Sequence, residues 1–343
     1  MTEVWENFLG IDHVGIHDDF FGLGGDSFLA VQLVAELQKT LQVELYIHSL
    51  LEKSTIATLA ESIQAMPTED TPASSLMLPP SLVKIQAGNP LRQPIFLIHP
   101  AGGRVYFYRD LARCLGPEQP VYGFEAQGVD GKAQPLTQIE IMATHYINVM
   151  RVVQPDGPYI LGGASFGGMV AFEMAQQLDA LNQKIALLFM MDTAGPGQVS
   201  KENIDDVTLL AYALGLGLKP KLQISQEHFY QLDLEEQVRY LFKSGEIAKR
   251  AYPNEAISHI HHFLHVLKTD NQTMDNYVPK TYQGKILFFR ARERDTFMPT
   301  NPENYWKNLA TGGVDIHEVP GYHVSINFQP HVAVMAKKLK TYL

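Results

Sequence analysis

One short stretch constrains the fold of this chain more than any other. An apolar run at residues 159–162 leads into Gly163-x-Ser165-x-Gly167, and apolar residues at helical spacing follow over 169–178. A strand that turns sharply into a helix at a serine is a nucleophile elbow, and a Cβ at either glycine would collide with the neighbouring elements. Ser165 is therefore the candidate nucleophile. The backbone N–H of Phe166 is a candidate donor to the oxygen of an attacked carbonyl.

Apolar strand-like runs alternate with helical patterns on both sides of this elbow. Repeated βα units of this kind predict a mostly parallel sheet with helices on both faces, and active sites in such folds lie at the carboxyl ends of the strands. The expected strands are 94–99, 121–124, 159–162, 185–192, 285–291 and 314–319, and the expected helices between them are 106–115, 139–153 and 169–178.

Two further polar residues follow predicted strands. Asp192 ends the strand at 185–192, and His323 follows the last strand within Gly321-Tyr322-His323. The order Ser, Asp, His along the chain resembles that of α/β-hydrolase enzymes. His323 would take the proton of Ser165, and Asp192 would orient and stabilise the imidazole. Asp295 is the rival acid, because many α/β-hydrolases place theirs after the strand that corresponds to 285–291.

The loop after the first predicted strand, His99-Pro100-Ala101-Gly102-Gly103, is the expected source of a second oxyanion donor. Its glycines permit close approach of the backbone. The N–H of Ala101 is the first candidate and that of Gly102 the next. We expect His99 to brace the loop through a hydrogen bond rather than to act as a base.

The first 66 residues have a different pattern. Apolar residues at helical spacing predict about four short helices, near 4–9, 29–37, 47–51 and 54–63, the last capped by Ser54. Ser27 falls at the start of the second helix. A phosphodiester on its hydroxyl would meet unpaired N–H groups and the positive end of the helix dipole, although a simple helix cap is the alternative.

The residues around Ser27 carry a family resemblance. Phe20-Phe21-x-Leu23-Gly24-Gly25-Asp26-Ser27 resembles the attachment motif of acyl and peptidyl carrier proteins. The resemblance implies that Ser27 carries a covalent 4′-phosphopantetheine arm whose thiol holds the growing chain as a thioester. It also implies a phosphopantetheinyl transferase as a partner, which Asp26 would face.

The second domain resembles a type I thioesterase, the releasing domain of polyketide and nonribosomal peptide assembly lines. The resemblance depends on His99-Pro100-x-Gly102-Gly103, on the elbow at Ser165, on Asp192 and on Gly321-x-His323. The family's acid corresponds to Asp192, which favours it over Asp295. The expected organisation is a carrier domain at 1–66, a proline-containing flexible linker at 67–81 and an α/β-hydrolase domain at 82–343. A helical lid is expected to be inserted at about 196–275, with helical patterns at 207–218, 227–242 and 257–267.

Together the two resemblances imply the terminal carrier–thioesterase didomain of a modular synthase. Such a chain would release a finished polyketide or peptide through an acyl-serine intermediate, by hydrolysis or by macrocyclisation. The upstream synthase domains would be its partners, and an abrupt start at the carrier suggests an excised piece of a longer polypeptide. Two alternatives are an editing thioesterase that clears stalled acyl groups and a non-catalytic module that only binds partner domains.

Composition excludes several other classes. The chain has 343 residues and a net charge of −10, with no basic run, so we expect no nucleic-acid or anionic-membrane binding. No apolar run approaches the ~20 residues of a membrane span, and an acidic N-terminus favours a cytoplasmic protein. The single cysteine, Cys114, is expected to be a small buried apolar residue. His259, His261, His262 and His265 are expected to be packing or solvated residues, and no metal is expected.

Overall fold

A computed structural model of the chain describes residues 1–25, 27–41, 45, 50, 53–64, 78–105, 108–199, 231, 232, 236, 255–295 and 297–343. The chain divides into two compact units, one made of Met1–Met77 with Ile204–His261 and the other of Leu78–Asn203 with His262–Leu343. Among the described residues, no helix is both long and apolar enough to cross a membrane.

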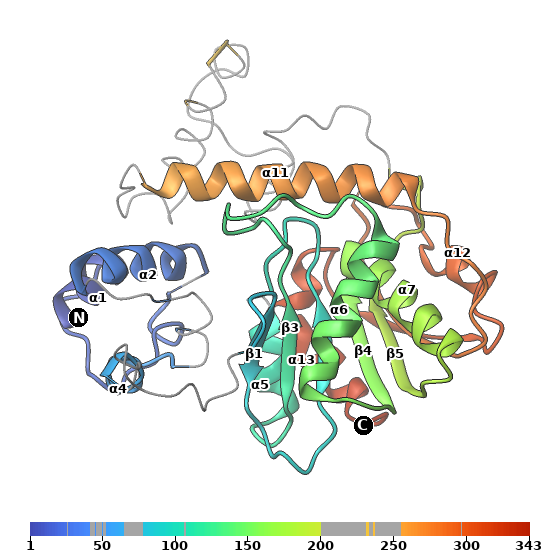
Figure 1. The fold of residues 1–343 in the computed structure, drawn as a ribbon, viewed down its shortest axis with the longest axis horizontal. Coiled ribbons are helices and arrows are strands. Elements are labelled where there is room, and N and C mark those ends of the chain that lie inside the picture. Colours follow the sequence, from blue (N-terminus) through green and yellow to red (C-terminus); the bar gives the residue numbers. More distant parts are fainter. Residues whose placement is uncertain are drawn as a thin grey trace. The chain divides into compact units, whose positions relative to one another are not determined.

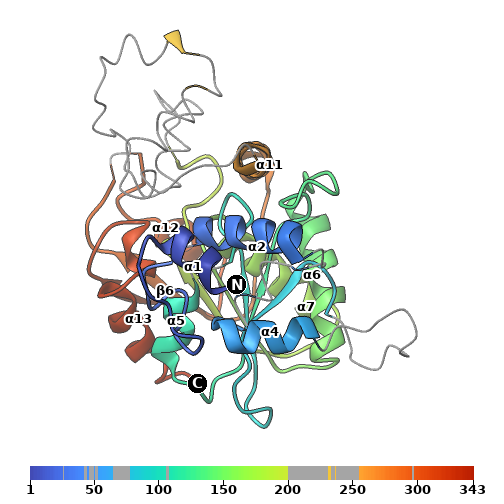
Figure 2. The same ribbon diagram turned by 90° about the vertical axis from the view of Figure 1, so that its left-hand side faces the viewer.

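Three helices of the first unit are described: α1 (Thr2–Leu9), α2 (Ser27–Leu41) and α4 (Ile56–Gln64), shown in Figure 2. Their apolar faces enclose a small core in which Trp5 meets Phe20 edge-on, with ring centroids 5.1 Å apart. The helix predicted at 47–51 lies mostly outside the described residues. The predicted cap of α4 was wrong by one residue: Thr55 Oγ1 accepts the Thr58 N–H, whereas the Ser54 hydroxyl donates to Asp19.

The second unit is built on a seven-stranded sheet in the order β1-β3-β2-β4-β5-β6-β7. β1 runs antiparallel to β3, and the other neighbours are parallel. The mostly parallel sheet predicted from the sequence is therefore confirmed, although β1 was not predicted. The strands are β1 (Leu82–Gln86), β2 (Ile95–Ile98), β3 (Val121–Phe124), β4 (Tyr159–Ala164), β5 (Ile185–Met191), β6 (Ile286–Ala291) and β7 (Val314–Val319).

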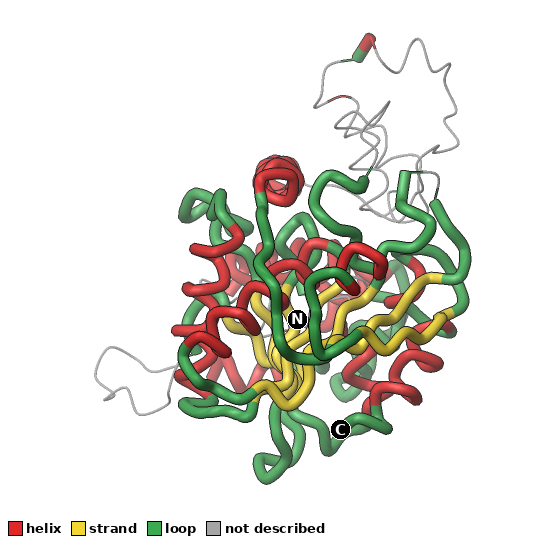
Figure 3. The backbone as a smooth tube through the Cα atoms, turned by 90° about the vertical axis from the view of Figure 1, so that its right-hand side faces the viewer, coloured by secondary structure: helices red, strands yellow, loops and turns green. Residues whose placement is uncertain are grey.

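Helices cover both faces of this sheet, so the strands lie between two helical layers (Figures 1 and 3). Helices α6 (Ile139–Val153) and α7 (Phe166–Ala180) lie on one face, together with α12 (Glu303–Lys307), whose Trp306 packs on Phe172. Helices α5 (Arg109–Leu115) and α13 (His331–Leu339) pack on each other at the other face. The core between α6, α7 and the sheet includes Phe96, Tyr146 and Phe172, all fully buried.

Helix α11 (Glu255–Asn276) contacts the loop that follows β2, at the carboxyl end of that strand. Figure 1 shows α11 running across this edge of the sheet, and Figure 2 looks along its axis. Phe263 of α11 lies against Gly102 of the loop after β2. The helix predicted at 257–267 is thus found within a longer one, whereas the helices predicted at 207–218 and 227–242 lie outside the described residues.

Candidate active site

The elbow at Ser165 has the geometry that its sequence predicts. β4 ends at Ala164, α7 begins at Phe166, and Ser165 between them has φ 52° and ψ −121°. An L-residue with positive φ is strained, which is typical of a nucleophile held by its surroundings. A Cβ at Gly163 would lie 2.2 Å from the Gly167 carbonyl carbon, and one at Gly167 would lie 2.3 Å from the Ile98 carbonyl oxygen. Both positions therefore exclude any side chain.

A buried tyrosine braces the elbow from behind. The Tyr108 hydroxyl donates to the Ile98 carbonyl at 2.6 Å and accepts the Ala164 N–H at 2.8 Å. It thus ties the end of β2 to the residue that precedes Ser165. Burial raises the pKa of Tyr108 well above its usual range, so its hydroxyl stays neutral. The sequence analysis did not identify this residue.

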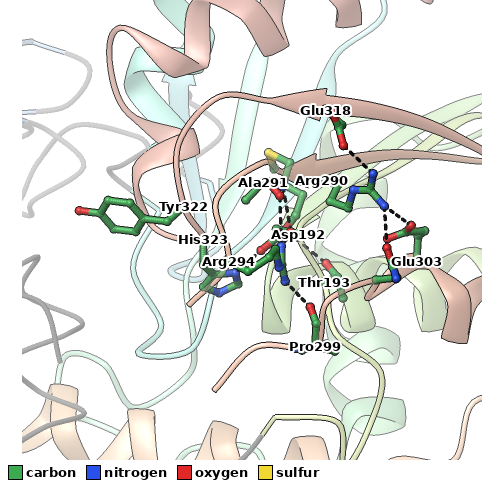
Figure 4. A network of polar contacts seen from close by, with 12 residues as sticks. Asp192, Thr193, Arg290, Ala291, Arg294, Pro299, Glu303, Glu318, Tyr322 and His323 are labelled. Carbon is green, nitrogen blue, oxygen red and sulfur yellow. Dashed lines mark hydrogen bonds and ion pairs between the residues drawn. The ribbon is translucent and has the colours of Figure 1, made fainter. Parts of the chain in front are cut away.

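Asp192 and His323 meet at the carboxyl ends of β5 and β7 (Figure 4). Asp192 Oδ2 lies 2.8 Å from His323 Nδ1 and is fully buried, whereas His323 is 11% exposed. Because Nδ1 faces a carboxylate, it carries the proton and Nε2 is left with a lone pair. That is the tautomer a general base needs. Asp295, the rival acid, lies in the loop after β6, where its carbonyl accepts the Met298 N–H.

The second oxygen of Asp192 is also fully engaged. Oδ1 accepts the Ala291 N–H at 3.0 Å and a guanidinium N–H of Arg294 at 2.6 Å. Arg294 is held in turn by the Pro299 carbonyl at 2.7 Å (Figure 4). Burial alone would raise the pKa of Asp192. The hydrogen bond and charge of His323, the charge of Arg294 and the Ala291 N–H outweigh it and leave that pKa below its ordinary value. Arg294 was not identified from the sequence.

Two backbone N–H groups near Ser165 are available to a ligand. Neither the Ala101 N–H nor the Phe166 N–H has a hydrogen-bond acceptor among the described residues. The Gly102 N–H, the other candidate, donates at 3.0 Å to Asp270 Oδ2 on α11. Of the two candidates in the loop after β2, only Ala101 therefore has an N–H free to meet a developing oxyanion.

His99 is fully buried and hydrogen bonded on both sides. Its Nδ1 lies 2.9 Å from the Pro100 carbonyl, and its Nε2 lies 2.8 Å from the Tyr146 hydroxyl. A carbonyl only accepts, so Nδ1 donates to Pro100 and Nε2 accepts the tyrosine O–H. Burial lowers the pKa of His99 to about 4, against the weaker opposing effect of the Pro100 carbonyl. His99 is thus a neutral brace for the loop.

The remaining predictions from the sequence concern Ser27, a metal site and Cys114. Ser27 is the first residue of α2, and Asp26 lies outside the described residues. Within the described part of the chain, no group of His, Cys, Asp and Glu could hold a metal ion. His265 Nε2 lies 3.4 Å from the Gln134 side-chain oxygen. Cys114 was expected to be buried and apolar, but it is only partly buried and its sulfur accepts a hydrogen bond from Gln329.

Comparison with known proteins gives matches over both units. Residues 93–339 match the thioesterase domain family, and residues 1–63 match the phosphopantetheine attachment site family. The malpibaldin synthetase of Mortierella alpina is 31% identical over the whole chain, and a dimodular nonribosomal peptide synthase of Bacillus subtilis is 32% identical over 99% of it. The chain spans only 6% and 14% of the lengths of these two relatives.

Solved structures give the same assignment. A four-domain nonribosomal peptide synthetase, holo-AB3403 bound to AMP and glycine, matches 99% of this chain and 25% of its own, with a TM-score of 0.69 and 28% identity. The Vlm2 thioesterase domain matches 76% of this chain and 96% of its own, with a TM-score of 0.56, and at 23% identity it supports the fold alone. The chain therefore belongs to the thioesterase domain family, and a phosphopantetheine attachment region precedes that domain, as in nonribosomal peptide synthetases.

Proposed function

We propose that this chain releases a finished peptide from a thioester carried on Ser27, through an acyl intermediate on Ser165. The observation that carries the proposal is the hydrogen bond between Asp192 and His323 at the same sheet edge as the strained Ser165. β4 and β5 are parallel neighbours, so the residues that follow them lie at one edge. The synthetases that match the whole chain favour a peptidyl over a polyketide substrate.

The residues around Ser27 fit a phosphopantetheine. Ser27 opens a helix of 15 residues, whose N-terminal N–H groups and dipole favour a phosphate. The turn before it is closed by the Gly25 N–H, which donates to the Phe20 carbonyl at 2.9 Å, and a Cβ at Gly24 would meet nothing within 4 Å. When attached, the group presents the peptide as a reactive thioester. A phosphopantetheinyl transferase and upstream synthase domains are the partners that this role requires.

In the proposed mechanism, Ser165 Oγ attacks the thioester carbonyl while His323 Nε2 takes its proton. Asp192 keeps Nδ1 protonated and stabilises the imidazolium, and Arg294 and the Ala291 N–H hold the carboxylate in place. The N–H groups of Ala101 and Phe166 receive the negative charge that develops on the carbonyl oxygen. His323 then protonates the leaving thiolate.

Deacylation uses the same residues in reverse. His323 deprotonates either water, which yields a free acid, or a hydroxyl or amine of the bound chain, which yields a ring. The choice depends on the shape of the substrate chamber and on the exclusion of water. Editing of stalled acyl groups would use this chemistry too, but a carrier in the same chain favours release of the product of that carrier.

Intact-protein mass spectrometry tests the proposal. Ser27 is loaded with a peptidyl-phosphopantetheine, and the peptidyl mass is followed in the parent, in Ser165→Ala and in Ser27→Ala. We expect loss of the peptide from the parent, retention in Ser165→Ala and no loading of Ser27→Ala. The mass of the product separates an acid from a ring. Equal retention in the parent and in Ser165→Ala, with no labelling of Ser165 by a fluorophosphonate, would refute an enzymatic role and leave a binding module.

A further inference from the structure

Helix α11 makes close contact with the loop that carries the candidate oxyanion donor. Asp270 Oδ2 accepts the Gly102 N–H at 3.0 Å. Gly102 has φ +101°, and a Cβ there would lie 2.5 Å from the Phe263 ring. One turn along the helix, Val266 is buried and would lie 3.0 Å from a Cβ at Gly103. The glycines therefore let the loop lie directly against the helix.

Asp270 is an unusual residue for this position. It is 1% exposed, and its Oδ1 is buried without a hydrogen-bond partner among the described residues. Burial raises the pKa of Asp270 well above its ordinary value, and the Gly102 N–H opposes this only in part. A buried carboxyl group destabilises a fold unless hydrogen bonds or an ion pair compensate for its lost hydration. Here it satisfies a backbone N–H that would otherwise be buried and unpaired.

The groups that face Asp270 belong to one buried network. His99 Nδ1 lies 3.9 Å from Asp270 Oδ2, and the Tyr146 hydroxyl that binds His99 Nε2 is 3.4 Å from the Glu125 carbonyl. The Glu125 carboxylate pairs with Arg104 at 3.2 Å. Burial disfavours the charged form of all three groups, because it lowers the pKa of His99 to about 4 and raises the pKa values of Tyr146 and Asp270.

We propose that Asp270 is a positioning residue, which fixes the loop at Gly102 so that the N–H of Ala101 points at the forming oxyanion. By occupying the Gly102 N–H, Asp270 leaves Ala101 as the loop's donor. Because Asp270 lies on α11, the placement of this helix is coupled to the completeness of the oxyanion hole. The proposal rests on the function proposed above, and it adds a residue outside the catalytic triad whose effect is confined to transition-state binding.

The test compares Asp270→Ala with Asp270→Asn in the full chain. An asparagine oxygen can still accept the Gly102 N–H that Asp270 Oδ2 accepts at 3.0 Å. Tyr277→Phe is the matched control, because it removes a partly buried hydrogen bond of 2.8 Å from the Tyr277 hydroxyl to Glu173, away from the loop. Hydrolysis of a soluble N-acetylcysteamine thioester is measured together with the affinity for a peptidyl trifluoromethyl ketone and for the corresponding alcohol.

We expect kcat of Asp270→Ala to fall about tenfold to a hundredfold with KM unchanged, which is less than the roughly 10²–10³-fold loss on deleting an oxyanion donor. Affinity for the ketone, whose adduct carries an oxyanion, should fall by a similar factor, while affinity for the alcohol stays constant. Asp270→Asn and Tyr277→Phe should match the parent. Equal loss of ketone and alcohol binding, or unchanged kinetics in Asp270→Ala, would overturn the proposal.

Two further measurements distinguish a failure of the proposal from a variant that does not fold. If Asp270→Ala does not fold, Asp270→Leu fills the site with an apolar side chain while leaving the Gly102 N–H unpaired. If neither folds, amide exchange in the unaltered protein decides: Gly102 should be protected throughout, and Ala101 only when the ketone is bound. Protection of Ala101 without the ketone would contradict the proposal. A parent that neither hydrolyses the thioester nor reacts with a fluorophosphonate would instead refute the proposed function.

Discussion

The buried His99 predicts a specific loss of stability in mild acid. Its pKa is lowered from 6.5 to about 4 in the folded protein, because burial disfavours the imidazolium. A folded pKa below the unfolded value means that the stabilisation is complete above pH 6.5 and is lost as pH falls toward 4. At about 1.4 kcal/mol per pH unit, the whole effect is about 3 kcal/mol. About 2 kcal/mol of this should be lost between pH 7 and pH 5.

The two tryptophans of the chain make this measurable, because Trp5 lies in the first unit and Trp306 in the second. In a Trp5→Phe background, fluorescence reports the unfolding of the second unit in urea at pH 7, 6 and 5. His99→Asn is the comparison, since its amide can replace the Nδ1 donor to Pro100 but does not titrate. We expect the free energy of unfolding of the parent to fall by about 2 kcal/mol more than that of His99→Asn over this range. If the free energy of unfolding falls equally with pH in the parent and in His99→Asn, His99 is not the source of the acid sensitivity and the reasoning is refuted.

Three shorter predictions concern the site itself. Asp192→Asn should lower kcat on a thioester by about 10⁴-fold, because the imidazole loses its required tautomer; an activity close to that of the parent would favour Asp295 as the acid. Arg294→Gln should raise the pKa of Asp192, because the charge of the guanidinium helps to lower it, and an unchanged or lower pKa in a carboxyl NMR titration would contradict the proposed geometry. Gly163→Ala should unfold at lower temperature and lose fluorophosphonate labelling, because its Cβ would meet the backbone at 2.2 Å; a melting temperature equal to that of the parent would refute the close approach.

Periodicity predicted most of the fold. The strands at 121–124 and 314–319 and the helix at 139–153 have the bounds observed in the structure, because each has apolar residues at the period of its element and is bounded by polar, glycine or proline residues. β1 was missed because Leu82–Gln86 follows directly on a proline-containing segment and forms the antiparallel edge strand. Helix α13 was missed although it buries Val332, Met335 and Ala336 at helical spacing.

The choice between Asp192 and Asp295 shows what the sequence left open. Both follow strands of one parallel sheet, so both were placed at the same edge, and only a resemblance favoured Asp192. The 2.8 Å distance to His323 now supports Asp192 on geometry. The cation of Arg294 beside it comes from a loop a hundred residues further along the chain, and no local pattern connects the two.

The sequence around Asp270 indicates a buried acidic residue, which the sequence analysis did not identify. Val266, Leu267, Met274 and Tyr277 are buried at the spacing of one helical face, and Asp270 lies on the same face. The helix was expected to end at 267, so this acidic residue fell outside the predicted apolar stripe. An acidic side chain on a buried helical face needs a partner that its own helix cannot supply. Here the partner is the Gly102 N–H of the loop after β2. The acidic residue in that stripe therefore implied a contact between α11 and another part of the chain, and the structure identifies which part.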